Sequence, residues 1–135
     1  MKTIITEPKD DLGRWLCHRT GGNYSGEGQY IGLVNNGVLV AVVGYEDYNG
    51  KSIRMHVAAE GKSWLNKEFL WYAFHYPFNE LKVTKILGLV DSTNEAALRF
   101  DKHLGMIEEA VIKDAAPHGN LHILTMTRDQ CRFLK

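Results

Sequence analysis

Short runs of apolar residues, separated by polar residues and glycines, recur along the chain and are typical of strands. Asn36-Gly37 joins two of these runs and predicts a hairpin, because both residues tolerate positive φ. Residues 38–43 are nearly all apolar, so we expect this strand near the centre of a sheet. The predicted strands are residues 3–5, 30–34, 38–43, 53–57, 85–90, 109–113 and 121–127.

Apolar residues three or four positions apart predict helices between these strands. The first helix has Pro8 in its first turn and ends at Gly21, which is suited to the left-handed position after a helix. A later helix begins with Ser92 and Glu95 as a capping box and ends at Gly105. The residues expected on its inward face are Ala97, Phe100 and Leu104.

The longest predicted helix is rich in aromatic residues and covers about residues 64–76. Pro77 is expected to end it, because proline lacks the N–H that continues a helix. One stripe recurs at helical spacing and is predicted to be buried. Its members are Leu65, Phe69, Tyr72 and Tyr76.

These elements follow one another as β-α-β-β-β-α-β-α-β-β, which indicates an α+β or mixed α/β domain around one sheet. The strand at residues 53–57 leads through a tight turn into the aromatic helix, and residues 85–90 return beside it as a crossover. Such a turn offers free backbone N–H groups and the positive end of a helix, which suit a phosphate.

Composition is typical of one globular domain over residues 1–135, with 44% hydrophobic and 24% charged residues. Lys plus Arg and Asp plus Glu number 16 each. This balance argues against nucleic acid or an anionic membrane as a partner held mainly by charge. Cys17 and Cys131 lack metal or redox spacing, and no signal or membrane-spanning run is present. We therefore expect a cytoplasmic protein with both cysteines reduced and packed as small core residues.

Residues 94–106 combine an Asn, an Ala three positions on, an aromatic residue, and Leu-Gly before a hydrophobic residue. With the order of elements, they resemble the GCN5-related N-acetyltransferase (GNAT) family over nearly the whole chain. Residues 107–112 and the hairpin at Gly119 look like the subgroup that acetylates protein N-termini, especially those of ribosomal proteins. The resemblance implies a mostly antiparallel sheet with a splayed parallel pair of strands and flanking helices.

The resemblance also implies an acetyl-CoA site where the fourth and fifth strands splay apart. The end of the fourth strand would pair with the pantetheine arm, and the turn after it would hold the pyrophosphate at a helix N-terminus. The implied activity is transfer of an acetyl group from acetyl-CoA to a primary amine of a protein, peptide or small molecule. The implied cofactor-binding residues are Val57, Gly61, Lys62, Ser63, Trp64, Asn94 and Phe100.

Two positions depart from the family pattern. The phosphate turn usually reads Arg or Gln, two residues, Gly, one residue, and Gly or Ala, whereas Trp64 lies near the expected second glycine. Asp101 stands where many members carry a Tyr that protonates the leaving thiolate. A carboxylate is ionised near neutral pH unless it is buried, and is then a poor proton donor. The alternative function is therefore that of a catalytically weak or inactive module of the same fold, which binds acyl-CoA or has a regulatory role.

An amine must lose a proton before it attacks a thioester, and a backbone N–H near Val57 would polarise the thioester carbonyl. His56 is one candidate base, on the strand beside the site and with a suitable pKa. Its alternative role is a histidine on a solvated or helix-packed face. Asp91 ends the next strand near the predicted cleft and is the second candidate, with turn formation as its alternative role.

The sequence contains no readable code for the acceptor. Acceptor pockets in this fold come from loops that correspond here to residues 12–28 and 114–120. The polar residues that could line them are Tyr24, Glu27, Asp114 and His118. A second copy of the chain is a candidate partner, because the apolar strand near the C-terminus could pair edge to edge.

Overall fold

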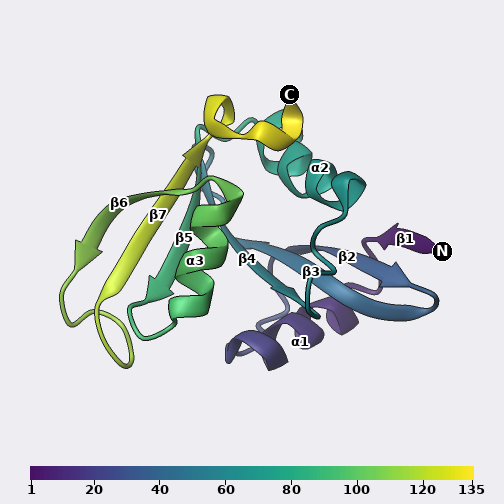
Figure 1. Ribbon diagram of the computed structural model, residues 1–135, viewed down its shortest axis with the longest axis horizontal. Helices are drawn as coiled ribbons and strands as arrows, with labels where there is room; N and C mark the ends of the chain where they lie inside the picture. Colours follow the sequence, from purple (N-terminus) through teal and green to yellow (C-terminus); the bar gives the residue numbers. More distant parts are fainter.

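The computed structural model describes all residues from Met1 to Lys135. One seven-stranded sheet runs through it in the order β1-β2-β3-β4-β5-β7-β6 (Figure 1). Along the chain the elements follow as β-α-β-β-β-α-β-α-β-β, with short additional helical turns after α2 and β7. The predicted order and the α+β class, with a mostly antiparallel sheet, are both confirmed.

The first half of the sheet is antiparallel and contains β1 (Lys2–Ile5), β2 (Gln29–Asn35), β3 (Val38–Glu46) and β4 (Ser52–Ala59). The hairpin between β2 and β3 turns at Asn36 and Gly37, whose φ values are 52° and 82°. Both lie in the left-handed region, as the Asn-Gly pair predicts. β3 lies between β2 and β4, and its central residues are buried, as its apolar sequence predicts.

The second half of the sheet contains β5 (Lys85–Asp91), β7 (Leu121–Thr127) and the edge strand β6 (Ile107–Ile112). β4 and β5 are parallel but pair only where Ser52–Arg54 face Lys85–Leu87. Beyond this short ladder the two strands diverge, as Figure 1 shows, while β5 pairs with β7 along its whole length. The splayed parallel pair expected from the resemblance is therefore present.

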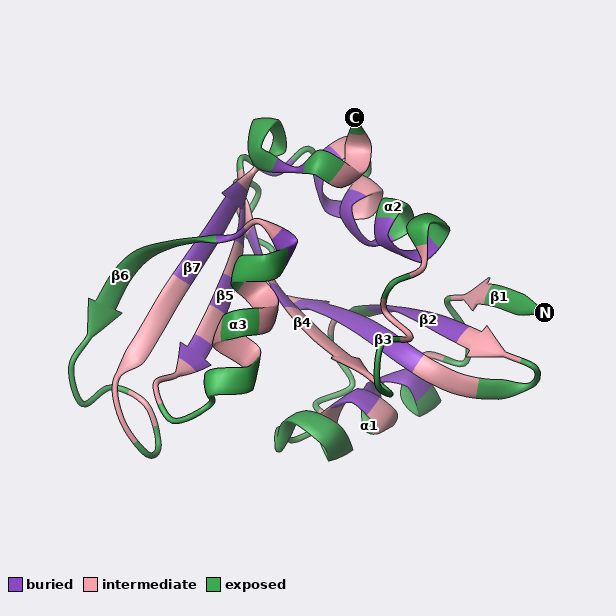
Figure 2. Cartoon of the chain, in the orientation of Figure 1, coloured by how far each residue is buried: buried purple, intermediate pink, exposed green.

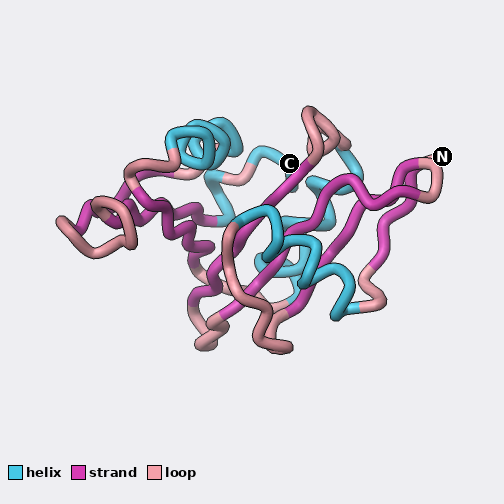
Figure 3. Tube along the Cα trace, turned by 90° about the horizontal axis from the view of Figure 1, so that it is seen from below, coloured by secondary structure: helices cyan, strands magenta, loops and turns pink.

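Helices cover both faces of the antiparallel half. α1 (Lys9–Thr20) lies across one face, which Figure 3 shows from below, and α2 (Lys67–His75) lies over the other. α1 ends at Gly21 with a φ of 80°, and Pro8 stands just before its first residue. The core is largest on the α2 side, where the buried parts of the sheet and of α2 meet (Figure 2). The smaller core beneath α1 consists of Leu12, Leu16, Tyr30 and Val42.

The predicted start of the aromatic helix was wrong, whereas its end at His75 agrees with the prediction to within one residue. α2 begins at Lys67, because Asn66 caps it by accepting a hydrogen bond from Phe69 N at 2.8 Å. At its other end the chain continues through a π-helical turn, Tyr76–Glu80, that contains buried Pro77. The predicted stripe is confirmed only in part: Phe69 is buried and Tyr76 packs against the core, but Leu65 precedes the helix and the Tyr72 side chain is exposed. The residues of α2 that are buried are Phe69, Leu70, Ala73 and Phe74.

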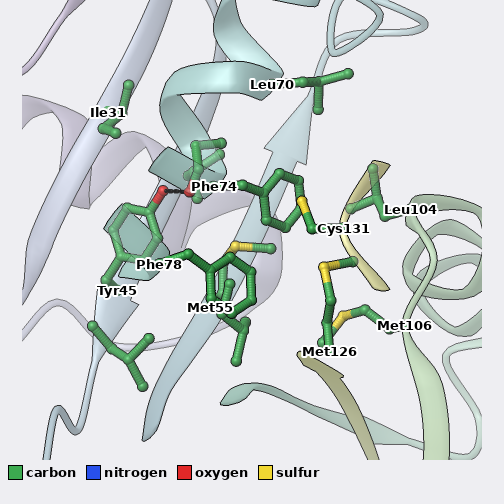
Figure 4. Packing of buried hydrophobic residues seen from close by; sticks show 14 of the residues in the cluster. Ile31, Tyr45, Met55, Leu70, Phe74, Phe78, Leu104, Met106, Met126 and Cys131 are labelled. Atoms are coloured by element: carbon green, nitrogen blue, oxygen red, sulfur yellow. Dashed lines mark hydrogen bonds between the residues drawn. The ribbon is translucent and has the colours of Figure 1, made fainter. Parts of the chain in front are cut away.

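A contact from the sheet explains how the chain passes Pro77 without leaving the helical path. Proline cannot donate to the carbonyl four residues earlier, which here belongs to Ala73. The buried hydroxyl of Tyr45, on β3, donates a hydrogen bond to that carbonyl oxygen (Figure 4). The ring of Tyr45 is also edge-on to that of Tyr76, with centroids 5.1 Å apart. The sheet thus satisfies the backbone group that the proline leaves without a partner.

α3 (Glu95–Leu104) packs over β5, and its cap differs from the predicted capping box. Asn94 is the N-cap and accepts from Ala97 N at 3.1 Å. The Ser92 hydroxyl instead accepts from Asn120 N, in the loop before β7, at 2.9 Å. The predicted left-handed end at Gly105 is confirmed, with a φ of 109°. Of the residues expected to face inward, Leu104 is buried, and Ala97 and Phe100 are half-buried against the core.

The two cysteines differ in burial. Cys131 is a core residue, as predicted, whereas Cys17 on α1 is only half-buried and belongs to neither core. Both are free thiols, and burial raises the pKa of each. None of the helices has both the length and the apolar character that crossing a membrane requires.

Candidate active site

The divergence of β4 from β5 opens a fork, and two cavities adjoin there. The first cavity has a volume of about 350 Å³ and the second about 460 Å³. Backbone groups of β4 beyond Arg54 that face the fork have no strand partner on that side, because the parallel ladder has ended. Free backbone groups of this kind bind extended ligands as an added strand would. The residues that line both cavities are Thr20, Val57, Asn94, Ala97 and Asp101.

The first cavity lies between the fork and two loops. Its floor is formed by His56 of β4 and Gly88 of β5, with Asp91 at the end of β5. Its walls are the end of α1 at residues 20–22 and the loop between β6 and β7 at residues 116–117. These loops fall within the segments predicted to bind the acceptor, but the polar residues singled out there, Tyr24, Glu27, Asp114 and His118, do not line this cavity.

Those four residues have other places in the structure. The Tyr24 ring covers Gly13 of α1, and its hydroxyl donates to Asp10. Glu27 lines a separate cavity beside β3, and Asp114 has a φ of 56° in the turn after β6. His118 contributes its backbone N–H to Asp91. Parts of both predicted loops therefore line the first cavity, whereas none of these four side chains does.

The second cavity extends from the fork towards the turn after β4. Among the predicted cofactor-binding residues, it is lined by Val57, Gly61, Trp64, Asn94 and Phe100, whereas Lys62 and Ser63 lie outside it. Trp64 stands edge-on to Phe100 of α3 with ring centroids 5.0 Å apart. The indole therefore forms part of the cavity wall and does not fill the turn.

The predicted phosphate cradle at a helix N-terminus is wrong in one respect. Residues 60–65 form tight turns, with Ser63 N bonded to Glu60 O at 3.0 Å and Leu65 N to Lys62 O at 3.0 Å. The helix itself starts later, at Lys67, with its N-terminus capped by Asn66. The part of the chain that lines the cavity here is therefore a turn at Gly61, where φ is 55°, and not the first turn of a helix.

Arg19, at the end of α1, is a lining residue that the sequence did not reveal. Its guanidinium bonds Glu60 at 2.7 Å across the rim of the second cavity and stacks over Trp15 at 3.6 Å from the ring centroid. A cation in this place suits an anionic ligand. Only the packing of α1 beneath β4 brings it there, so no local signal could have indicated it.

His56 lies on the floor of the first cavity, on the face of β4 opposite Met55 and Val57, as predicted. Burial lowers its pKa below the ordinary 6.5, and the neighbouring Arg54 guanidinium lowers it further. The imidazole is therefore neutral at pH 7 and able to accept a proton. The Arg54 guanidinium itself pairs with the Glu46 carboxylate at 3.0 Å.

Asp91 also lines the first cavity, but its oxygens are already engaged. Oδ1 accepts from Thr93 N at 3.0 Å and Thr93 Oγ1 at 2.8 Å, and Oδ2 accepts from His118 N at 2.9 Å. These hydrogen bonds lower its pKa. A carboxylate so stabilised is a weak base, and its geometry matches the alternative role in turn formation. Through these hydrogen bonds Asp91 connects the turn before α3 to the loop between β6 and β7.

Asp101 projects from α3 over Gly88 of β5 and lines both cavities. A Cβ atom at position 88 would lie 3.0 Å from Asp101 Oδ2. Burial raises the pKa of Asp101 from 3.8 to about 6. The carboxylate is therefore still mostly ionised at pH 7, as the sequence predicts, but its desolvation in the fold makes it a stronger base than an ordinary aspartate.

Comparisons with known proteins agree with the fold. A scan against models of protein families finds no match, and neither does a search of curated proteins. Among solved structures, mutant forms of the spermidine/spermine N-acetyltransferase SpeG from Vibrio cholerae superpose with a TM-score of 0.76 at 14% identity, over 96% of both chains. A dodecameric spermidine N-acetyltransferase from the same organism gives 0.72 at 13% identity, over 96% of this chain and 95% of that one.

An acetyltransferase of the GNAT family from Bacillus anthracis gives a TM-score of 0.61 at 17% identity, over 74% of this chain and 66% of that chain. At these identities the likeness shows a shared fold. The GNAT-like fold expected from residues 94–106 is confirmed. The finer resemblance to the ribosomal-protein subgroup gains no support from these structures.

Proposed function

We propose that the protein is an N-acetyltransferase, an acyltransferase that moves an acetyl group from acetyl-CoA to a primary amine. The observation that carries this proposal is the pair of cavities that adjoin at the fork between β4 and β5. One cavity can take the acetyl donor and the other the acceptor, so that the reacting groups meet at the shared wall. The shared fold with enzymes that acetylate spermidine supports it.

The donor is assigned to the second cavity. Unpaired backbone groups of β4 near Val57 would bond the pantetheine arm and polarise the thioester carbonyl, with Asn94 and Phe100 on the opposite wall. The pyrophosphate would lie at the turn after β4. Gly61 offers its backbone N–H there, since that of Ser63 already bonds Glu60 O. Trp64 covers the wall, and Arg19 at the rim and Lys62 in the adjoining turn supply positive charge.

The acceptor is assigned to the first cavity, with His56 as the base that removes the ammonium proton. Its place on the cavity floor and its neutral form at pH 7 support this role. Asp91 is the second candidate from the sequence, and its three hydrogen bonds favour a role in holding the acceptor loop. The acceptor amine belongs to a protein, a peptide or a small molecule, and a panel of amines distinguishes these classes.

Calorimetric titration with acetyl-CoA, with free CoA alongside, tests the donor site first. Saturable binding is expected, weakened by Lys62→Glu. A panel of amines then tests turnover, followed through release of the CoA thiol. Spermidine, an amino sugar and a peptide with a free amino terminus would represent three acceptor classes. Binding without turnover would favour the alternative of a catalytically inactive acyl-CoA-binding module, and absence of binding at millimolar donor would contradict both.

We also propose that a second copy can pair along the edge strand β6. All residues of β6 are exposed, among them Ile107, Val111 and Ile112, and an unpaired strand edge favours such pairing. One structural neighbour is itself a dodecamer. Size-exclusion chromatography at several concentrations tests this, and replacing Val111 by Lys should shift any oligomer towards the monomer.

A further inference from the structure

Asp101 is the only ionisable residue whose side chain lines both cavities. The other residues common to the two are Thr20, Val57, Asn94 and Ala97. Its carboxylate lies directly over the backbone of β5, where only the absence of a side chain at Gly88 leaves room for it. A group in this place lies between the donor cavity and the acceptor cavity.

The surroundings of Asp101 leave its carboxylate without a partner. Burial is the cause of its altered pKa, and neither a charge nor a hydrogen bond offsets it. The other ionisable residues that line the cavities are His56 on β4, Asp91 at the end of β5, Arg19 on α1 and Glu60 in the turn after β4. Arg19 and Glu60 pair with each other, and Asp91 holds its own turn.

We propose that Asp101 carries a proton from the attacking nitrogen to the leaving sulfur during acetyl transfer. This inference rests on the proposed function. His56 takes one proton from the ammonium group, and the free amine attacks the thioester carbon. The carboxylate of Asp101 then takes a proton from the positively charged nitrogen of the tetrahedral adduct. As the C–S bond breaks, Asp101 gives that proton to the thiolate and returns to its ionised form.

The protons balance in this sequence. The ammonium nitrogen loses two protons in becoming an amide: one leaves through His56 to water, and the other ends on the CoA thiol. The pKa of Asp101, about 6, suits both halves of its task. The ionised form predominates at pH 7 and can accept, while the acid is stronger than a thiol of pKa about 8.5 and can donate to the thiolate.

The test compares Asp101→Asn with the wild type, using acetyl-CoA and the best acceptor from the amine panel. We expect kcat to fall by a factor on the order of 10²–10⁴, a typical contribution from acid–base catalysis. Binding of acetyl-CoA, measured by calorimetry, should stay within about threefold of the wild type. Both ionisations contribute to the acidic limb of kcat/KM in the wild type, so Asp101→Asn should lose the ionisation near pH 6 and keep that of His56, and His56→Gln should do the reverse. Asp129→Asn, an exposed carboxylate far along the chain, is the matched control and should change neither rate nor limb.

Several outcomes would overturn this role. Turnover by Asp101→Asn at the wild-type rate with an unchanged limb would show that Asp101 moves no proton, while leaving the proposed function intact. An acidic limb that is unchanged in Asp101→Asn but disappears in His56→Gln would assign the ionisation to His56 alone. A wild type that binds acetyl-CoA but acetylates no amine would contradict the proposed function itself, and the proton carrier with it.

Discussion

The carboxylate of Asp101 occupies the space that a side chain at Gly88 would fill, with Oδ2 only 3.0 Å from the position of such a Cβ atom. We therefore expect Gly88→Ala to push Asp101 out of its place at the fork. Activity should fall by about tenfold or more, because small misplacements of reacting groups lower rates steeply. Steady-state kinetics with acetyl-CoA and the best acceptor measure this effect.

Gly32→Ala is the matched control for that substitution. Gly32 lies in β2, two strands from β4, and lines neither cavity. Its added Cβ would lie 2.8 Å from Leu12 Cδ2, so the steric demand is similar. Both variants should lose stability, by roughly 1–3 kcal/mol, as overpacked positions do. Only Gly88→Ala should lose activity when both are assayed well below their melting temperatures. Equal losses of activity in the two variants would contradict a specific contact with Asp101.

Stability should depend on pH through Asp101 in a direction that its pKa determines. The folded-state pKa is about 6 and the ordinary value is 3.8, so the folded protein binds this proton more tightly than the unfolded chain does. Stability therefore falls as pH rises from about 4 to about 6, and the penalty is complete above that range. Two units of pKa correspond to at most about 3 kcal/mol.

Asp101→Asn removes this penalty because the amide cannot ionise. Urea unfolding should show the variant to be more stable than the wild type at pH 8, by up to about 3 kcal/mol, and of nearly equal stability at pH 4. His56 titrates in both proteins, so its contribution cancels in the difference. If the variant were less stable than the wild type at pH 8, contacts within the protein would have to stabilise the ionised carboxylate by more than its burial costs.

The strands and their turns could be predicted because the signals that specify them are local. Alternating apolar positions and the Asn36-Gly37 turn are determined within a few residues, and the structure confirms them. The same holds for the glycines that end α1 and α3. The start of α2 was missed because apolar Trp64 and Leu65 continue the helical pattern through what is a turn.

The features that could not be predicted depend on contacts between distant parts of the chain. Pro77 reads as a helix end, and only the hydroxyl of Tyr45 reveals why the helical path continues. The pKa of Asp101 is set by burial over β5, which no motif in α3 encodes. The sequence thus indicated the fork and several of the residues that line it, whereas the electrostatics of the fork come from tertiary packing.

The hydroxyl of Tyr45 should contribute measurably to stability. Tyr45→Phe leaves the Ala73 carbonyl without its donor in the core, which should cost about 1–3 kcal/mol. Tyr48→Phe is the matched control, because the Tyr48 side chain is half exposed and its hydroxyl bonds Leu81 O only weakly, at 3.4 Å. It should change the free energy of unfolding by less than about 0.5 kcal/mol. Urea unfolding of both variants measures these changes. Equal losses in the free energy of unfolding would contradict a stabilising role for the hydrogen bond from Tyr45.

Substitution of the two helix-capping asparagines distinguishes an effect on donor binding from an effect on stability. Asn94 caps α3 and lines both cavities, whereas Asn66 caps α2 and lines neither. Each change to alanine should lower stability by about 1 kcal/mol, because each removes one capping hydrogen bond.

The amide nitrogen of Asn94 has no partner within the protein and is available to the pantetheine, so Asn94→Ala should also raise the Kd for acetyl-CoA by about fivefold. Calorimetric titration with acetyl-CoA compares the Kd values of the two variants, each measured at the same number of degrees below its melting temperature. A similar change in Kd for Asn66→Ala would mean that the loss reflects helix stability, and that Asn94 does not contact the donor.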